Sequence, residues 1–101
     1  MTVRLAPQVA DFLRRLAPEP RRRLRRALRD LAKGKGDIKP LEGPLQDYSR
    51  LRVGPYRVIL SYTSARSVDC VFVERRSLIY EVFADAMIER LMLPGPGRDR
   101  R

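Results

Sequence analysis

Apolar residues near the start of the chain recur at helical spacing in two consecutive segments. The first segment begins after Pro7, contains Val9, and predicts a helix that extends to Ala17. Pro18 and Pro20 interrupt this helix and open a second one. Its apolar residues follow the i, i+3, i+4, i+7 pattern: Leu24, Ala27, Leu28 and Leu31. We therefore expect a short helical hairpin with one apolar side to bury.

A different pattern, with alternating polar and apolar residues, covers much of the segment 48–62 and is typical of half-buried β-strands. Gly54 and Pro55 interrupt the alternation. Glycine supplies the positive φ that a two-residue hairpin turn needs at its first central position, and proline tolerates the second position. This turn predicts three cross-strand pairs: Val53 with Tyr56, Arg52 with Arg57 and Leu51 with Val58.

The remaining segments complete a small α+β domain. We expect a short strand over 2–6, a loop over 39–44, a third long strand over 68–74 and a last helix over about 78–92. The resulting order is β-α-α-β-β-β-α. It predicts a small antiparallel sheet packed by an N-terminal helical hairpin and a C-terminal helix, with the helices covering one face of the sheet.

The predicted hairpin gathers three arginines on one face. If the apolar residues of both strands turn to the core, then Arg50, Arg52 and Arg57 share the opposite face. Like charges directly opposite each other on a sheet are destabilising. A local rule that is broken without visible compensation often marks a functional site, and the natural partner of clustered arginines is a polyanion.

Length and charge support this interpretation. The 101 residues predict one domain over 1–93, followed by a flexible basic tail over 94–101. The chain carries 22 lysines and arginines against 12 acidic residues, a net charge of +10, which favours an acidic or nucleic-acid partner. A coding bias toward arginine explains much of the excess but not the placement on the hairpin. The only lysines are Lys33, Lys35 and Lys39.

The composition excludes several kinds of site. The sequence contains no histidine, which excludes imidazole bases and Ser-His-Asp triads. Its single cysteine, Cys70, excludes an internal disulfide and a zinc-binding cysteine cluster, and we expect it to be a buried thiol. No segment has the roughly 20 apolar residues of a membrane span. The start, Met1 to Arg4, does not resemble a signal peptide, so we expect a cytoplasmic protein with no metal and no cofactor.

Three features together resemble the RelE/ParE family of bacterial type II toxins. They are the phrase Leu41-Glu42-Gly43, the hairpin over 48–60 and the strand end over 73–80, in this order and at this spacing. The resemblance extends from about Val3 to Met92. It implies a toxin that a co-expressed antitoxin protein neutralises. RelE-type members cut mRNA in the ribosomal A site, using the 2′-hydroxyl as nucleophile, whereas ParE-type members inhibit DNA gyrase.

The resemblance also implies site residues. In the RelE branch, which we favour, the matching positions are Arg50, Arg52, Arg57, Arg76 and Tyr80, and the hairpin pattern alone identifies the first three. Arg75 stands where many members carry His or Lys. We therefore predict two sets of residues. The catalytic candidates are Arg52, Arg57, Arg76 and Tyr80, and the RNA-binding candidates are Arg50, Arg75, Lys33, Lys35 and Lys39.

Phosphoryl transfer from a 2′-oxygen requires a base, charge stabilisation and an acid. Arg57 and Arg76 suit charge stabilisation, because a guanidinium stays charged and holds two phosphate oxygens. Arginine is a very poor base, which leaves Tyr80 as the candidate base, although it could instead stack on a nucleobase or belong to the core. Two alternatives therefore stay open: a ParE-like gyrase inhibitor, and a remnant that only binds its antitoxin or nucleic acid. The antitoxin is expected to cover either the arginine face or the last helix.

Overall fold

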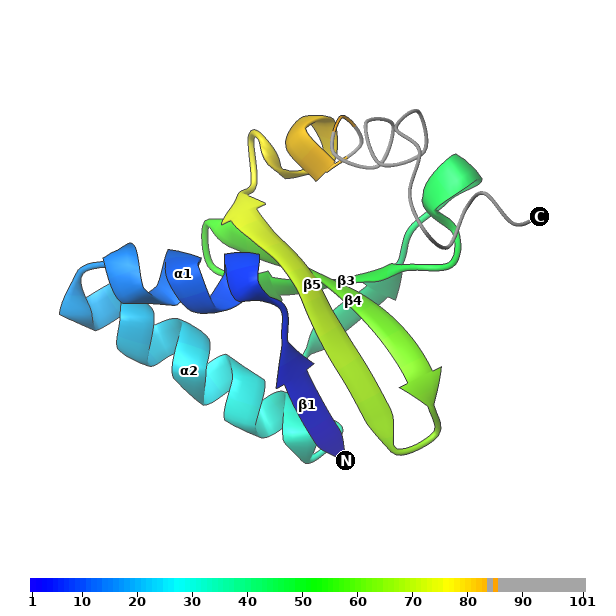
Figure 1. The fold of residues 1–101 in the computed structure, drawn as a ribbon, viewed down its shortest axis with the longest axis horizontal. Helices are drawn as coiled ribbons and strands as arrows, with labels where there is room; N and C mark the ends of the chain where they lie inside the picture. The colour runs from blue at the N-terminus through cyan, green and yellow to red at the C-terminus, as the bar shows by residue number, and fades with distance from the viewer. Residues whose placement is uncertain (84, 86–101) are drawn as a thin grey trace.

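The N-terminal part of the chain forms the predicted helical hairpin. The computed structural model describes residues 1–83 and 85. Helix α1 spans Pro7–Arg15 and α2 spans Pro18–Ala32, each with a proline in its first turn. Arg21 joins them, because its Nη2 donates to the carbonyl oxygen of Leu16 at 2.7 Å, directly after α1 ends. In Figure 1 the two helices lie side by side against the sheet.

The strands form one five-stranded sheet in the order β1-β5-β4-β3-β2. Their bounds are β1 Thr2–Leu5, β2 Asp37–Pro40, β3 Ser49–Val53, β4 Tyr56–Ser64 and β5 Ser67–Arg75. The α+β class is confirmed, but the sheet is mixed, since β1 pairs with β5 in parallel. The prediction of an antiparallel sheet was therefore wrong for the pairing of β1. The helical hairpin between β1 and the later strands provides the crossover that a parallel pair requires.

Strand β2 is a second difference from the sequence analysis, which placed a loop over 39–44. Residues 37–40 pair antiparallel with β3, and Pro40 lies opposite Ser49. Proline is tolerated there because β2 is an edge strand and needs no amide donor on its free side. A short 3-10 helix, Gly43–Leu45, follows it.

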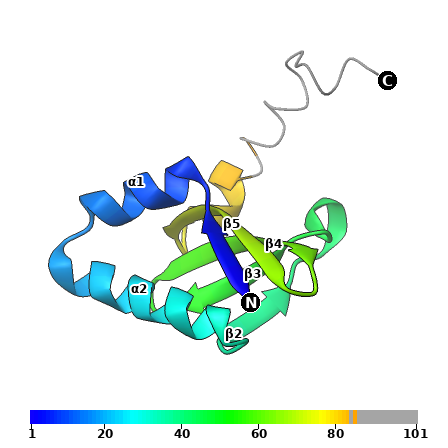
Figure 2. The same ribbon diagram turned by 60° about the horizontal axis from the view of Figure 1, so that its bottom comes forward.

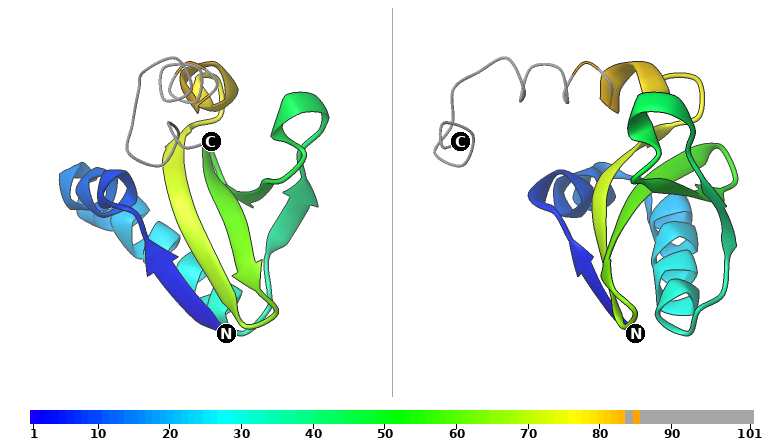
Figure 3. Two further views of the ribbon diagram at one scale, coloured as in Figure 1. Left: turned by 45° about the vertical axis from the view of Figure 1, so that its right-hand side comes forward. Right: turned by 90° about the vertical axis from the view of Figure 1, so that its right-hand side faces the viewer.

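Side chains pack on both faces of the sheet. The larger core lies under α1 and α2 and includes Leu24, Leu31, Leu51, Val58 and Leu60. Ile59 lies between Val58 and Leu60 in the sequence, so its side chain faces the other side, where it packs with Ile79 and Phe83. The prediction that helices cover one face was therefore wrong. Figure 3 shows α1 and α2 to one side of the sheet and the helical turn after β5 at another end.

The structure describes only the beginning of the predicted last helix. Residues 79–83 and 85 are helical, and Ile79 and Phe83 are buried. Phe83 is held by two aromatic neighbours, with ring centroids 5.2 Å from Tyr48 and 5.8 Å from Phe72. The rest of that helix, and the predicted tail over 94–101, lie outside the described residues.

Gln8 fastens α1 to strand β5. Its side-chain Nε2 donates to the carbonyl oxygen of Val73 at 2.8 Å, and its Oε1 accepts from the Val73 amide at 2.9 Å. The side chain thus continues the pairing of β5 beyond the end of β1, where β1 and α1 meet in Figure 2. These two hydrogen bonds fix the C-terminal end of β5, which leads directly to Arg75 and Arg76.

Candidate functional site

The turn between β3 and β4 positions the predicted arginine face. The three predicted cross-strand pairs are all present, so Arg52 lies directly opposite Arg57. Gly54 adopts the positive φ expected at this turn, +57°. Arg50 lies opposite Ile59, and Ile59 faces away from α1 and α2. Arg50, Arg52 and Arg57 therefore share this face, which we call the arginine face.

Arg57 is the buried centre of this face, with only 6 % of its surface exposed. Its Nη1 donates to the carbonyl oxygen of Gly54 at 2.9 Å and to that of Tyr56 at 3.0 Å. Its Nε and Nη2 form no hydrogen bond with any residue that the structure describes. The turn thus holds the guanidinium in place through one nitrogen and leaves donors for an anion.

Several side chains lie close enough to Arg57 to affect the pKa of its guanidinium. Burial lowers the pKa of the Arg57 guanidinium below its ordinary value of 12.5, and the charges of Arg52, Arg76 and Arg50 lower this pKa further, in that order. Tyr80 acts on the Arg57 pKa in the opposite direction. All five predicted residues of the family site are therefore close enough to interact electrostatically around Arg57.

Arg76 reaches the site through its main chain. Its amide donates to the carbonyl oxygen of Pro55 at 2.7 Å, which ties the end of β5 to the β3–β4 turn. Arg75 points elsewhere. It lies opposite Tyr56, and its guanidinium carbon stands 5.6 Å from the centre of the Tyr56 ring, on the side of the larger core.

Tyr80 is at the surface. It is 40 % exposed, while its neighbour Ile79 is fully buried. Packing of Ile79 and Phe83 against the sheet therefore turns Tyr80 outward, and its effect on Arg57 places it beside the arginine face. The possibility that Tyr80 belongs to the core is thereby removed.

The remaining candidates lie around this cluster. Arg50 forms an ion pair with Asp37, with Nη1 3.2 Å from the carboxylate oxygen, and Lys39 lies opposite Arg50 on β2. Lys33 and Lys35 lie in the exposed connection after α2. The three lysines are not among the charges that shift the Arg57 pKa.

Sequence reasoning missed Arg23, which comes from α2 and reaches the same turn. A side-chain carbon placed on Gly54 would lie 3.0 Å from Cζ and Nη1 of Arg23 and 3.1 Å from its Nη2. Three atoms at such similar distances indicate that the guanidinium lies flat against the turn. Helical periodicity places Arg23 only on the polar side of α2 and cannot reveal this contact, because tertiary packing brings α2 beside the turn.

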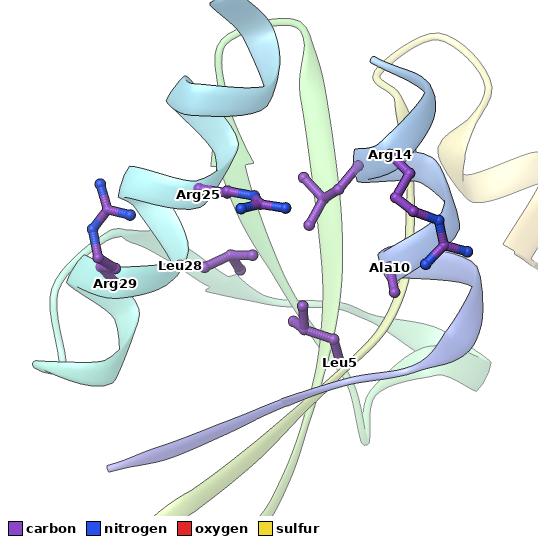
Figure 4. Close-up of a pocket in the computed structure, with 7 residues that line it drawn as sticks. Leu5, Ala10, Arg14, Arg25, Leu28 and Arg29 are labelled. Atoms are coloured by element: carbon purple, nitrogen blue, oxygen red, sulfur yellow. The ribbon is translucent and has the colours of Figure 1, made fainter. Parts of the chain in front are cut away.

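A separate groove lies between α1, α2 and β1, with a volume of about 420 Å³. Figure 4 shows Leu5, Ala10 and Leu28 at its floor, and three arginine side chains on the helices beside it. These three arginines, which we call the arginine rim, are Arg14, Arg25 and Arg29. Leu5 is 41 % exposed, although it is apolar, and belongs to the edge strand β1.

Within residues 1–83 and 85, no group of three cysteine, aspartate or glutamate side chains is placed to hold a metal ion. Over the same residues, no helix has the length and apolarity needed to cross a membrane.

Comparison with known proteins identifies structural neighbours. No family model matches the sequence, and no curated protein matches it either. A chain of the RelBE2 toxin–antitoxin complex from Mycobacterium tuberculosis is 22% identical, covering 74% of this chain and 96% of that one, with a TM-score of 0.59. The RelB–RelE antitoxin–toxin complex from Methanococcus jannaschii gives 24% identity, 79% and 98% coverage, and a TM-score of 0.62.

The third neighbour is the YoeB/ParE toxin from Agrobacterium tumefaciens, at 19% identity, 75% and 99% coverage, and a TM-score of 0.55. At these identities the similarity establishes the fold. The chain has the RelE/ParE toxin fold, and the resemblance found in the sequence is confirmed at that level.

Proposed function

We propose that this chain is the toxin of a type II toxin–antitoxin system and that it cuts mRNA in the ribosomal A site. The observation that carries the proposal is the surroundings of Arg57. A buried guanidinium with free donors stands among Arg52, Arg76 and Arg50, beside an exposed tyrosine. Such a cluster suits a phosphate whose negative charge increases in the transition state, because guanidinium groups fixed in advance need no reorganisation.

Each residue of the cluster has a role in this proposal. Arg57 and Arg76 hold the non-bridging oxygens of the scissile phosphate, and Arg52 adds charge beside them. Tyr80 takes the proton from the attacking 2′-hydroxyl, because it acts on Arg57 from beside the arginine face and a tyrosine gives up its own proton far more readily than an arginine. Attack of the 2′-oxygen on phosphorus breaks the bond to the 5′-oxygen, which takes a proton from water, so the products are a 2′,3′-cyclic phosphate and a 5′-hydroxyl.

Primer extension on an mRNA in a reconstituted translation reaction tests the proposal. The unaltered protein should produce cuts at A-site codons, and these cuts should vanish when ribosomes are omitted. Removing Arg57 and Arg76 by alanine substitution should slow cleavage at least 10²–10³-fold, roughly the effect of losing one transition-state donor. Arg66→Ala, which removes an exposed arginine in the β4–β5 turn, is the matched control.

Because Arg57 also supports the turn, Arg57→Lys should accompany the alanine variant. Lysine keeps the positive charge but cannot bind two phosphate oxygens side by side, so we expect a folded protein with reduced cleavage. Undiminished cleavage by the folded Arg57→Ala, Arg76→Ala variant would rule out the assigned roles.

One observation favours a gyrase inhibitor as the second candidate. The described groups that act on the Arg57 pKa include no lysine, and the chain contains no histidine, so among these groups Tyr80 alone is a candidate base. A protein of this kind would inhibit supercoiling by purified gyrase and leave translated mRNA intact. Absence of inhibition at concentrations that stop growth would exclude it.

The antitoxin is proposed to be a separate chain with an acidic, amphipathic segment that occupies the groove between α1, α2 and β1. Exposed Leu5 suits an apolar side chain, and the arginine rim suits carboxylates. The arginine face and the last helix remain the other candidate surfaces. Co-purification with the neighbouring gene product should be lost in Leu5→Glu and kept in Leu78→Glu, a leucine of similar exposure, 44 %, next to the last helix. The reverse result would favour the last helix.

A further inference from the structure

Helix α2 presents a row of arginines away from its buried leucines. Glu19, Arg22, Arg23 and Arg26 follow the i, i+3, i+4, i+7 spacing of one helical face and surround a shallow depression of about 380 Å³. Leu24, Leu28 and Leu31 lie on the core side of the same helix. The row is therefore a separate surface, distinct from the side that stabilises the fold.

Within residues 1–83 and 85, no ion pair neutralises the charges of this row. Arg22, Arg23 and Arg26 form no ion pair with any residue that the structure describes, although Glu19 is on the same face. Like charges three and four residues apart on a helix repel each other. An external anion would remove this repulsion.

The row meets the candidate site at the β3–β4 turn. The guanidinium of Arg23 lies against Gly54, and the carbonyl oxygen of Gly54 accepts the hydrogen bond from Arg57. One turn residue therefore separates the two sets of arginines. A chain of phosphates bound at the arginine face could continue past the turn and along α2.

We propose that Arg22, Arg23 and Arg26 bind the phosphate backbone of RNA as an extension of the arginine face. This inference rests on the proposed function, because it assumes an RNA in the site. An acidic protein segment fits less well, since the residues that line the depression include no apolar side chain for such a segment to bury. The groove of Figure 4, with its exposed leucine, is the contrasting surface.

Fluorescence anisotropy with a labelled single-stranded RNA of mixed sequence, over a range of salt concentrations, tests the proposal. The variant Arg22→Gln, Arg26→Gln should bind RNA roughly tenfold more weakly, and the magnitude of its log–log salt slope should fall by about 1.4, because two phosphate contacts are lost. The matched control, Arg15→Gln, Arg66→Gln, loses the same charge from exposed positions elsewhere and should keep most of the affinity. Arg23→Gln alone should weaken both RNA binding and ribosome-dependent cleavage.

Three results would overturn the inference. The first is no RNA binding by the unaltered protein, and the second is an equal loss of affinity in the two double variants. The third is competition by polyglutamate, with the Arg22→Gln, Arg26→Gln variant losing as much affinity for polyglutamate as for RNA. Cleavage measured by primer extension separates this outcome from failure of the proposed function. If the unaltered protein cuts mRNA but the row does not affect RNA affinity, only the inference fails. If RNA binding depends on the row but no cleavage occurs, only the nuclease assignment fails.

Discussion

The two faces of the β3–β4 hairpin differ sharply in burial and charge. Leu51 and Val58 alternate with Arg52 and Arg57 along the same two strands, yet the first pair is at most 1 % exposed within the larger core. The second pair sets two positive charges against each other on the opposite face. The comparison shows how a period of two lets one hairpin carry stability on one side and candidate chemistry on the other.

The arginine face acts against folding, whereas the core face supports it. The pKa of Arg57 is lowered by burial and by the charges of neighbouring arginines, which means that the folded protein disfavours the charged form. The core face must compensate for this cost. A bound polyanion would relieve it, so ligand binding and thermal stability should increase together.

Removing a large side chain from the core face should have the largest effect. Leu51→Ala is expected to lower the free energy of unfolding by about 2–5 kcal/mol, because it leaves a cavity among well-packed residues. Urea denaturation followed by circular dichroism measures it. Tyr62→Ala, at a position 45 % exposed, should cost less than about 1 kcal/mol. Similar losses at both positions would contradict the assignment of the core.

The second-largest effect is expected at the turn that joins β3 to β4. Gly54→Ala is expected to lower the free energy of unfolding by about 1–2 kcal/mol, because a side chain is strained at its φ of +57°. Gly43→Ala is the matched control, since its φ is +66° and nothing lies within 4 Å of the added carbon. Both variants should lose stability in thermal melts. Only Gly54→Ala should also weaken RNA binding, because it displaces Arg23.

The stability of the larger core should fall at alkaline pH because of the buried thiol of Cys70 on β5. Burial, with a smaller effect from Asp69, raises the pKa of Cys70 from an ordinary 9.0 to about 12. The thiol ionises first in the unfolded chain, so its stabilising effect is present below pH 9 and is lost as pH rises from 9 toward 12. The loss should be about 1.4 kcal/mol per pH unit in this window. Cys70→Ala should lack this part of the pH dependence in denaturation measured from pH 8 to pH 10.

The smallest effect is expected at the paired arginines. Arg52→Gln should raise the free energy of unfolding by about 0.2–1 kcal/mol, because it removes the like charge directly opposite Arg57, while Asp37, which lies opposite Arg52 on β2, keeps its ion pair with Arg50. Arg50→Gln is the control and should give no gain, since Arg50 is paired with Asp37. Added salt should reduce the gain at Arg52. A loss of stability in Arg52→Gln at low salt would show that repulsion across the strands is not significant.

Local sequence signals predicted the hairpin well. Gly54 and the alternation around it were sufficient for the turn, for the three cross-strand pairs and for the arginine face, because these depend on neighbours in the sequence. The first helix starts at Pro7 as predicted and ends at Arg15, two residues before the predicted Ala17. Proline sets such starts, while helix ends depend on caps such as Arg21, which comes from the next helix.

Long-range features could not be predicted in the same way. The parallel pairing of β1 with β5, the edge strand β2 and the packing of Ile79 on the second face all depend on contacts between distant segments. Arg23 was missed for the same reason. Arg76 and Tyr80 were predicted as site residues from the family resemblance. Arg75, chosen with them, lies over Tyr56 on the other face.

The hydrogen bond from the Arg76 amide to Pro55 has a consequence for how this scaffold can change over time or in the laboratory. Because main-chain atoms fix the position, any residue other than proline can stand there without altering the backbone. The side chain at this point is therefore exchangeable at little cost to the fold. Arg76→His would place an imidazole beside Arg57 in a chain that contains no histidine. The same fold would then carry a group that can accept and donate a proton near neutral pH.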